Sequence, residues 1–308
     1  MNTMLAPSSP DALKRSVMDF MRRASAEVST HDEELLPALV NRLPRGITLY
    51  VAHTSKASLD DVVRVAVRIE SLGFRASPHI VARRLESERA LKDALRDLRD
   101  GGVEQLLLVA GDRPIPVGKF ASTIDVLETG AIVGADFKRV GVCGHPEGHK
   151  AIGPTALWNA LHDKQALAKR LGLNLHIVSQ FGFDPRAVCA WDRCLAQHGV
   201  FLPVHVGIAG PTPLPKLTKF AMQCGIATSL HALVRNLSAA SNLVQLATSP
   251  DEMVIGLVRG RAMHRDTRLL LPHFYSLGGA VATARWIRAV LEGNFEVHPD
   301  SGKFLLRA

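Results

Sequence analysis

Residues 87–112, SERALKDALRDLRDGGVEQLLLVAGD, hold one complete unit of helix followed by strand, and this unit decides the fold class. Ser87 is a favourable N-cap. The apolar residues after it recur at the spacing of one helix face, at Ala90, Leu91, Ala94, Leu95 and Leu98. Gly101 and Gly102 end the predicted helix, and the run QLLLVAGD predicts a strand over 105–112. Because this run is apolar without alternation, it is typical of a parallel strand that is buried on both faces.

The same pairing of a helix with a short apolar run recurs along the chain. Ser58 predicts the N-cap of a helix that ends at Gly73, and Asp184 followed by Pro185 predicts the start of a helix that ends at Gly199. Strands are predicted over 24–29, 47–55, 75–83, 105–112, 139–146, 175–183, 201–210 and 270–279. Eight such units in 308 residues favour a closed (β/α)8 barrel of the α/β class, a TIM barrel, over an open doubly wound sheet. No GxGxxG motif follows any of these runs.

We expect a single barrel domain over residues 24–295, with an N-terminal extension and helix over 1–23 and a C-terminal tail over 296–308. No appended domain is expected after the last barrel helix. The N-terminus lacks the apolar core of a secretory signal, and no apolar run approaches the roughly 18 residues of a membrane-spanning helix. The four cysteines form no CxxC pair, which is typical of free thiols in a reducing compartment. The sequence therefore predicts a cytoplasmic protein with no membrane partner.

The net charge of +8 and the pI of about 9.6 favour anionic partners or a simply basic surface. The chain has no run of five or more Lys and Arg residues, and only 5% of its residues are aromatic. Dedicated nucleic-acid binding is therefore disfavoured, and an anionic small molecule is the better match. A homo-oligomer remains possible.

Polar residues interrupt the predicted strands near their carboxyl ends. They are Glu27, His53, His79, Asp112, His145, His149 and Gln180. In a barrel these ends form one mouth, where active sites lie. A structural protein has little use for so many ionisable groups there, so the pattern favours an enzyme.

The stretch GVCGHPEGHK, residues 141–150, places two histidines four residues apart. A helical zinc motif needs both histidines on one continuous helix. Pro146 and Gly148 lie between His145 and His149 and break such a helix. The sequence therefore predicts a loop and no metal site, and a loop of this kind suits a planar or phosphorylated ligand.

This loop and four further stretches resemble the methylenetetrahydrofolate reductase family, in the same order and at similar distances. GHPEGH is similar to the family's YPEGHPE loop. SAEVS (25–29) resembles SFEFFPP, SPHIVAR (77–83) resembles PHLTC, LLLVAGDRP (106–114) resembles LALRGDPP, and IVSQFGFD (177–184) resembles ITQFFFD. Near the end, LPHFYSLGGAVATARW is similar to VHFYTLN. The match covers roughly residues 24 to 290.

The resemblance implies the interconversion of 5,10-methylenetetrahydrofolate and 5-methyltetrahydrofolate, with NADH or NADPH as hydride donor and FAD as the usual relay. It puts Glu27 on the catalytic glutamate, a general acid that protonates the leaving nitrogen as the folate ring opens. Asp112 would contact the pterin, tune the flavin and favour positive charge on the iminium. Gln180 would hydrogen-bond the pterin. Their ordinary alternatives are a strand-end ion pair for Glu27, a helix N-cap for Asp112 and a packing role for Gln180.

For the cofactor, the resemblance implies that His79, His145 and His149 contact the flavin and that Lys169 pairs with its diphosphate. His53, His176 and His205 are interpreted instead as core or wall histidines. The sequence departs from the family where Val28 to His31 replace Phe-Phe-Pro-Pro, where His145 replaces a tyrosine, and where the KVDAGA turn is missing. These departures resemble a short, divergent branch. They leave open a reductase that uses no flavin and a folate-binding relative without catalysis.

Overall fold

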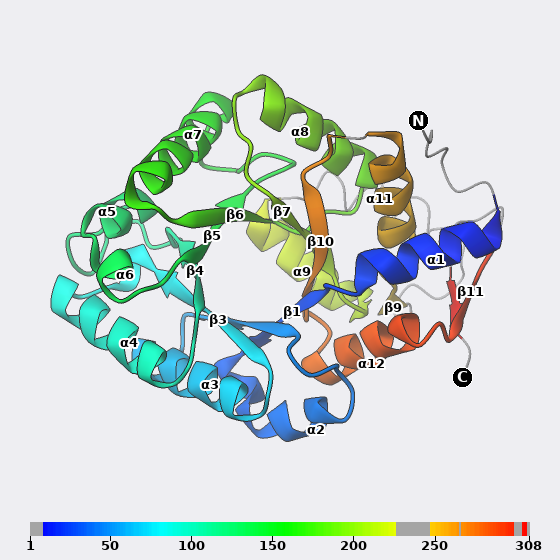
Figure 1. Cartoon of the computed structure of the whole chain (residues 1–308), viewed down its shortest axis with the longest axis horizontal. Coiled ribbons are helices and arrows are strands. Elements are labelled where there is room, and N and C mark those ends of the chain that lie inside the picture. The colour runs from blue at the N-terminus through cyan, green and yellow to red at the C-terminus, as the bar shows by residue number, and fades with distance from the viewer. Residues whose placement is uncertain (1–8, 226–246, 265, 299–303, 307–308) are drawn as a thin grey trace. The chain divides into compact units, whose positions relative to one another are not determined.

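The barrel predicted from the sequence is present in the computed structural model, which describes residues 9–225, 247–264, 266–298 and 304–306. Within these residues, eight strands are hydrogen-bonded in the closed order β1-β10-β7-β6-β5-β4-β3-β2 (Figure 1). They are β1 (Ser25–Ser29), β2 (Thr48–Ala52), β3 (Arg75–Val81), β4 (Gln105–Val109), β5 (Arg139–Gly144), β6 (Asn174–Ser179), β7 (Val204–Ala209) and β10 (Leu269–Tyr275). The (β/α)8 fold class is therefore confirmed.

Helices alternate with the barrel strands along the chain. They are α1 (Pro10–Met21), α2 (Leu36–Val40), α3 (Leu59–Ser71), α4 (Glu88–Asp100), α5 (Thr123–Glu128), α6 (Ala131–Gly134), α7 (Pro154–Leu171), α8 (Pro185–Gln197), α9 (Leu214–Cys224), α11 (Asp251–Met263) and α12 (Ala280–Leu291). Short 3-10 turns follow β1 and β3, at η1 (Thr30–Leu35) and η2 (Ala82–Arg84). Two small antiparallel pairs complete the fold, β8 (Thr212–Pro213) with β9 (Ala247–Thr248) and β11 (Phe295–Val297) with β12 (Phe304–Leu306).

Contacts divide the chain into two compact units, each named here after one residue. The Glu27 unit comprises Glu27–Gly144 and Trp158–Val178. The Gln180 unit comprises the described residues of Met1–Ala26, His145–Leu157 and Ser179–Ala308. The predicted site residues are accordingly divided between the two units.

In the Glu27 unit, β2 to β5 form consecutive parallel pairs whose register sets the interior layers. His79 of β3 pairs with Leu107 of β4, and Leu107 pairs with Gly141 of β5. A Cβ atom on Gly141 would lie 2.8 Å from Leu107 Cδ1 and 2.9 Å from His176 Nε2. These neighbours fill the interior at this level, so a side chain at position 141 has no room.

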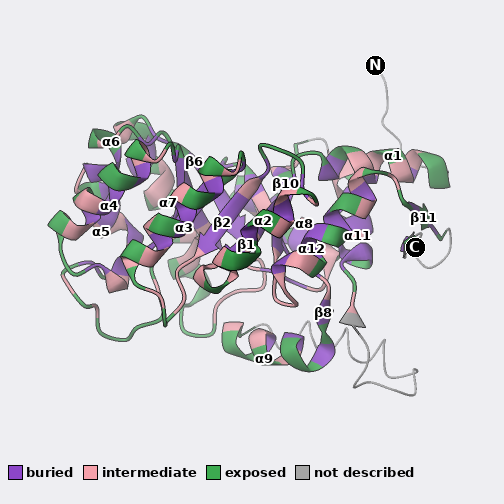
Figure 2. Cartoon of the chain, turned by 90° about the horizontal axis from the view of Figure 1, so that it is seen from below, coloured by how far each residue is buried: buried purple, intermediate pink, exposed green. Residues whose placement is uncertain are grey.

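Two helices of the Glu27 unit confirm the predicted caps. The hydroxyl of Ser58 accepts a hydrogen bond from the Asp61 N–H at the start of α3, and Ser87 does the same for Ala90 at the start of α4. The two helices pack against each other (Figure 1). Their inward residues are buried while their outer faces are exposed, next to strands that are buried on both faces (Figure 2).

In the Gln180 unit, β10 lies between the start of β1 and β7. Ser25 pairs with His273, and His273 pairs with Gly207. The predicted N-terminal helix is present as α1, which packs against α11, α12, β10 and β11. Behind α12, Phe304 stacks on Trp286 with an interplanar angle of 12° and a centroid distance of 5.8 Å.

Most of the barrel strands end earlier than the sequence indicates. The prediction for 105–112 overran β4, which ends at Val109, because Gly111 has a φ of +95° and Ala110 turns away to accept a hydrogen bond from the Arg83 N–H. Similarly, the prediction for 175–183 overran β6, which ends at Ser179. Among the described helices, none is long and apolar enough to cross a membrane.

Replacing Ser58 with Ala removes the N-cap of α3 and should lower the free energy of unfolding by about 1 kcal/mol. Denaturant unfolding followed by circular dichroism measures the change. Ser71→Ala is the matched control in the same helix, because the Ser71 hydroxyl only donates to the exposed carbonyl of Arg68. It should change stability by less than about 0.5 kcal/mol. Equal losses for the two variants would contradict the capping role.

Candidate functional site

Glu27 and His79 come from different strands of the Glu27 unit and face each other. The Glu27 Oε2 atom lies 3.6 Å from the His79 Nε2 atom. Only 17% of the Glu27 side chain and 13% of the His79 side chain are exposed. The structure therefore joins a residue that the sequence predicted as an acid to one that it predicted as a flavin contact.

Burial sets the protonation of this pair. Loss of solvent raises the pKa of Glu27 to about 8, and the nearby charge of Asp32 adds to the rise. Burial also lowers the pKa of His79 to about 3, with a further contribution from His53. Near neutral pH the carboxyl of Glu27 keeps its proton and the imidazole of His79 is uncharged. The contact is therefore between an acid and a neutral base, and not an ion pair.

A buried polar pair lies next to His79. The Tyr50 hydroxyl and His176 Nε2 are 3.0 Å apart, and both side chains are buried. Tyr50 also presents its ring edge to His79, with centroids 6.4 Å apart at 72°. Tyr50 packs with Leu107 and Val178 in one apolar cluster. The interpretation of His176 as a core histidine is confirmed, and Tyr50 is a neighbour of the site that the sequence analysis missed.

Cys143 and Lys164 are further neighbours that the site prediction missed. Cys143 follows Gly141 by two residues in β5, so both face the interior. Burial raises the pKa of the Cys143 thiol, Lys164 of α7 opposes this rise, and Glu27 adds to it. Burial lowers the pKa of Lys164. Because alternate residues of a strand face the same side, the sequence could have predicted that Cys143 faces the interior with Gly141. No sequence signal marks Lys164.

Asp112 lies in the loop 110–122 that follows β4, and its side chain is exposed. Among the described residues it forms no hydrogen bond or ion pair with Glu27 or His79. Arg83, at the end of β3, holds this loop. Its Nε donates to the carbonyl of Ala121 at 2.8 Å, and its Nη1 donates to the carbonyl of Arg113 at 2.8 Å. The position of Asp112 therefore depends on contacts made by Arg83.

Gln180 belongs to the Gln180 unit, directly after β6. Its side-chain Oε1 accepts a hydrogen bond from the Phe181 N–H at 3.1 Å. Next to it, the Tyr275 hydroxyl donates to the Ser179 carbonyl at 3.0 Å, which joins the ends of β6 and β10. The amide oxygen of Gln180 thus has a partner in the neighbouring residue. This agrees with the packing role that the sequence analysis gave as the alternative to pterin binding.

The loop after β5 brings His145 and His149 together. Their rings meet edge to face, with centroids 5.1 Å apart at 80°. Gly148 adopts a φ of +82° between them, so the predicted loop is confirmed and a continuous helix is excluded. Glu147 of the same loop lies against Gly182. A Cβ atom added to Gly182 would lie 2.6 Å from the Oε1 atom of Glu147. No group of three or more His, Cys, Asp or Glu side chains that could hold a metal ion occurs in the described ranges.

Lys169 is not brought to the other predicted residues of its unit. It is exposed in the last turn of α7, shortly before the helix ends at Leu171 and the chain turns into β6. Asn174, at the start of β6, donates to the carbonyl of Lys138 just before β5. A crossover helix runs back along the barrel, so its last turn lies at the amino ends of the strands. Lys169 therefore lies at the end of α7 that is away from the carboxyl ends of the strands.

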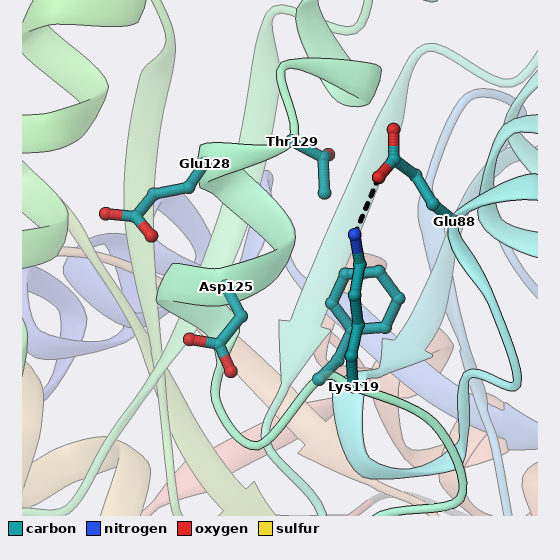
Figure 3. A pocket seen from close by; sticks show the side chains of 6 residues that line it. Glu88, Lys119, Asp125, Glu128 and Thr129 are labelled. Atoms are coloured by element: carbon teal, nitrogen blue, oxygen red, sulfur yellow. Dashed lines mark hydrogen bonds and ion pairs between the residues drawn. The ribbon is translucent and has the colours of Figure 1, made fainter.

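A separate surface pocket of the Glu27 unit lies over α5 (Figure 3). Its lining residues are Glu88, Lys119, Phe120, Asp125, Glu128 and Thr129. Lys119 forms an ion pair with Glu88 at 2.8 Å, and Asp125 accepts hydrogen bonds from the N–H groups of Ala121 and Ser122. Lys119, Glu88 and Asp125 are therefore already paired with neighbouring groups. None of the predicted site residues lines the pocket.

No family model matches the chain. Among solved structures, it is similar to dihydropteroate synthase from Thermus thermophilus, with 16% identity, 88% of this chain and 92% of that chain covered, and a TM-score of 0.45. It is also similar to oxaloacetate acetylhydrolase in complex with oxalate, with 12% identity, 87% and 81% coverage, and a TM-score of 0.46. Because these values are low, the assignment to the class of (β/α)8 barrel proteins rests on the strand order of this chain.

Replacing Glu27 with Gln should change how stability depends on pH. The pKa of Glu27 rises from 4.5 to about 8 on folding, so the folded chain binds more protons than the unfolded chain between these values. The resulting stabilisation is complete below the lower value and is lost as the pH rises to about 8. The difference in unfolding free energy, Glu27→Gln minus wild type, should therefore increase with pH across this window by a few kcal/mol.

Denaturant unfolding at a series of pH values measures this difference. Glu128→Gln is the matched control, because Glu128 is exposed on α5. Its difference from wild type should stay flat across the same window. Parallel curves for Glu27→Gln and wild type would show that Glu27 is not protonated in the fold.

Replacing Arg83 with Ala should release the loop 110–122, because the carbonyls of Arg113 and Ala121 lose their donor. Limited trypsin digestion should then cut after Lys119 several times faster than in wild type, because cleavage needs a locally open backbone. Mass spectrometry of the fragments locates the cut. Arg89→Ala, at an exposed position of α4, is the control and should leave the rate unchanged. An unchanged rate in Arg83→Ala would contradict the role of Arg83.

Proposed function

We propose that this protein is an oxidoreductase of the methylenetetrahydrofolate reductase type, which interconverts 5,10-methylenetetrahydrofolate and 5-methyltetrahydrofolate with NADH or NADPH. The observation that carries the proposal is Glu27, a carboxyl buried in the barrel that keeps its proton near neutral pH. The sequence stretches that resemble the family, with Glu27 on the catalytic glutamate, support the same conclusion.

The chemistry requires an acid of this kind. The five-membered ring of the substrate opens when its leaving nitrogen accepts a proton, which leaves an iminium at the methylene carbon ready for hydride. An acid whose pKa lies near the working pH combines an available proton with sufficient acidity. The carboxyl of Glu27 meets this condition, whereas an exposed glutamate is already ionised at neutral pH.

Two further residues have roles in this proposal. Asp112 supplies a negative charge that favours the iminium, and its exposed position leaves it accessible to a ligand. Gln180 binds the pterin through its amide nitrogen, because its oxygen already accepts from Phe181. The net charge of +8 favours attraction of an anionic folate tail.

FAD is the cofactor implied by the resemblance, and it would relay hydride from the nicotinamide to the substrate. The residues predicted for it agree only in part. His145 and His149 lie together on the loop after β5, which supports a shared contact with a planar ligand. Lys169 lies in the last turn of α7, and His79 faces Glu27. These two positions favour a second candidate function, in which the nicotinamide reduces the same substrate directly without flavin.

The proposed reaction is tested by the consumption of NADH or NADPH with 5,10-methylenetetrahydrofolate. Glu27→Gln should lower kcat by about 10²–10⁴, the usual contribution of a general acid. The wild-type rate should fall as the pH rises through about 8, because Glu27 then loses its proton. Glu128→Gln should keep wild-type rates. Full turnover in Glu27→Gln would refute the mechanism, and folate binding without turnover with either nicotinamide would favour a binding protein.

The visible spectrum of the purified protein, with and without added FAD, decides between the two candidate functions. A flavin band that titrates with FAD, together with activity that depends on it, supports the relay. A colourless protein that neither binds FAD nor needs it for turnover supports direct hydride transfer.

A further inference from the structure

The Nε2 atom of His79 is buried and has no hydrogen-bond partner within standard limits. A buried polar atom without a partner costs free energy, so such atoms are rarely left unsatisfied. The Glu27 carboxyl lies opposite this atom, with its Oε2 at 3.6 Å. A shift of about 0.5 Å by either side chain closes this gap to a normal hydrogen bond.

Other titratable groups of the Glu27 unit face the pair from several elements. Asp32 of η1 acts on Glu27, and His53 after β2 acts on His79. Cys143 of β5 is in turn influenced by Glu27 and by Lys164 of α7. The Nε2 atom of His53 contacts the backbone carbonyl of Ala57 instead, at 3.2 Å. The Glu27 carboxyl, by contrast, is within 3.6 Å of the His79 imidazole.

We propose that His79 is a positioning residue for Glu27, whose Nε2 accepts the carboxyl O–H and fixes the oxygen that carries the proton. This inference rests on the proposed function and deepens it, because it replaces the flavin contact implied for His79 by a role toward the acid. A carboxyl group can carry its proton on either oxygen and can rotate. An acceptor at one oxygen selects a single orientation, which proton transfer to a fixed substrate atom requires.

The proton balance is consistent with this role. The O–H bond of Glu27 breaks, the proton goes to the leaving nitrogen of the substrate, and a carboxylate remains. The lone pair of the neutral His79 then faces this carboxylate, which is unfavourable. His79 therefore favours the return of a proton to Glu27 before the next turnover.

The carbonyl stretching band of the protonated Glu27 carboxyl tests the contact directly by infrared spectroscopy. It is isolated as the difference between each protein and the same protein carrying Glu27→Gln. His79→Leu removes the acceptor, so the band should move to higher frequency. His79→Asn keeps an acceptor and should leave the band closer to the wild-type position. His162→Leu, on the exposed side of α7, should not move it.

Kinetics provide the second readout. His79→Leu should lower kcat by at least about tenfold with a much smaller change in KM, and His79→Asn should restore part of the loss. A role as a flavin contact would instead change FAD affinity and the visible spectrum while leaving the infrared band in place. If His79→Leu fails to fold by circular dichroism, the comparison of His79→Asn with wild type decides by the same two readouts.

The outcomes separate this inference from the proposed function. If the infrared band moves in His79→Leu but Glu27→Gln does not change turnover, the contact between His79 and Glu27 is supported and the reaction mechanism is refuted. If the band stays in place in His79→Leu but Glu27→Gln abolishes turnover, the reaction is supported and the role of His79 is refuted.

Discussion

The structure depends on one constraint, the limited space inside a closed parallel barrel whose strands are covered on both faces. Interior positions admit few side chains, and Gly141 shows the limit, because even a methyl group there would collide with Leu107 and His176. A polar side chain that enters this space leaves water and needs a partner. The barrel meets this requirement with pairs of residues from different strands.

Such pairs occur in both units. Tyr50 bonds His176 at 3.0 Å, and Ser25 bonds His273 at 3.0 Å. Both are within hydrogen-bond distance and both lie among buried neighbours, so they are structural. The third pair, Glu27 with His79, is longer at 3.6 Å and retains some exposure. A pair that is buried enough to shift its pKa values and loose enough to rearrange is suited to chemistry.

The chemical character of Glu27 follows from its surroundings more than from its residue type. Burial raises its pKa to about 8, and the uncharged His79 offers no positive charge to reverse this. Glu88, half-exposed at the start of α4, shows the opposite behaviour, because its contacts with Lys119 and Lys92 lower its pKa to about 2. The same side chain is thus an acid inside the barrel and a permanent anion on its surface.

The fold could be predicted from the chain because its signals are local. Ser58, Ser87 and Asp184 each begin a helix through contacts within three residues, and apolar runs mark the eight strands. Strand ends were less predictable, because β4 ends where the N–H of Arg83, from the turn η2 after β3, donates to the carbonyl of Ala110. The place of Lys169 in the last turn of α7 was likewise beyond the sequence, since a residue match does not say which turn of a helix carries the residue.

The amino-acid sequence by itself determined the order of helices and strands, the closed barrel that this order favours, and the residues that resemble a folate reductase. Only the tertiary structure decided that His79 faces Glu27, that Tyr50 and Cys143 surround them, and that Arg83 holds the loop of Asp112. The physical reason is that hydrogen bonds within a helix turn join near neighbours, whereas the protonation of a buried group depends on solvent exclusion and on charges from distant strands.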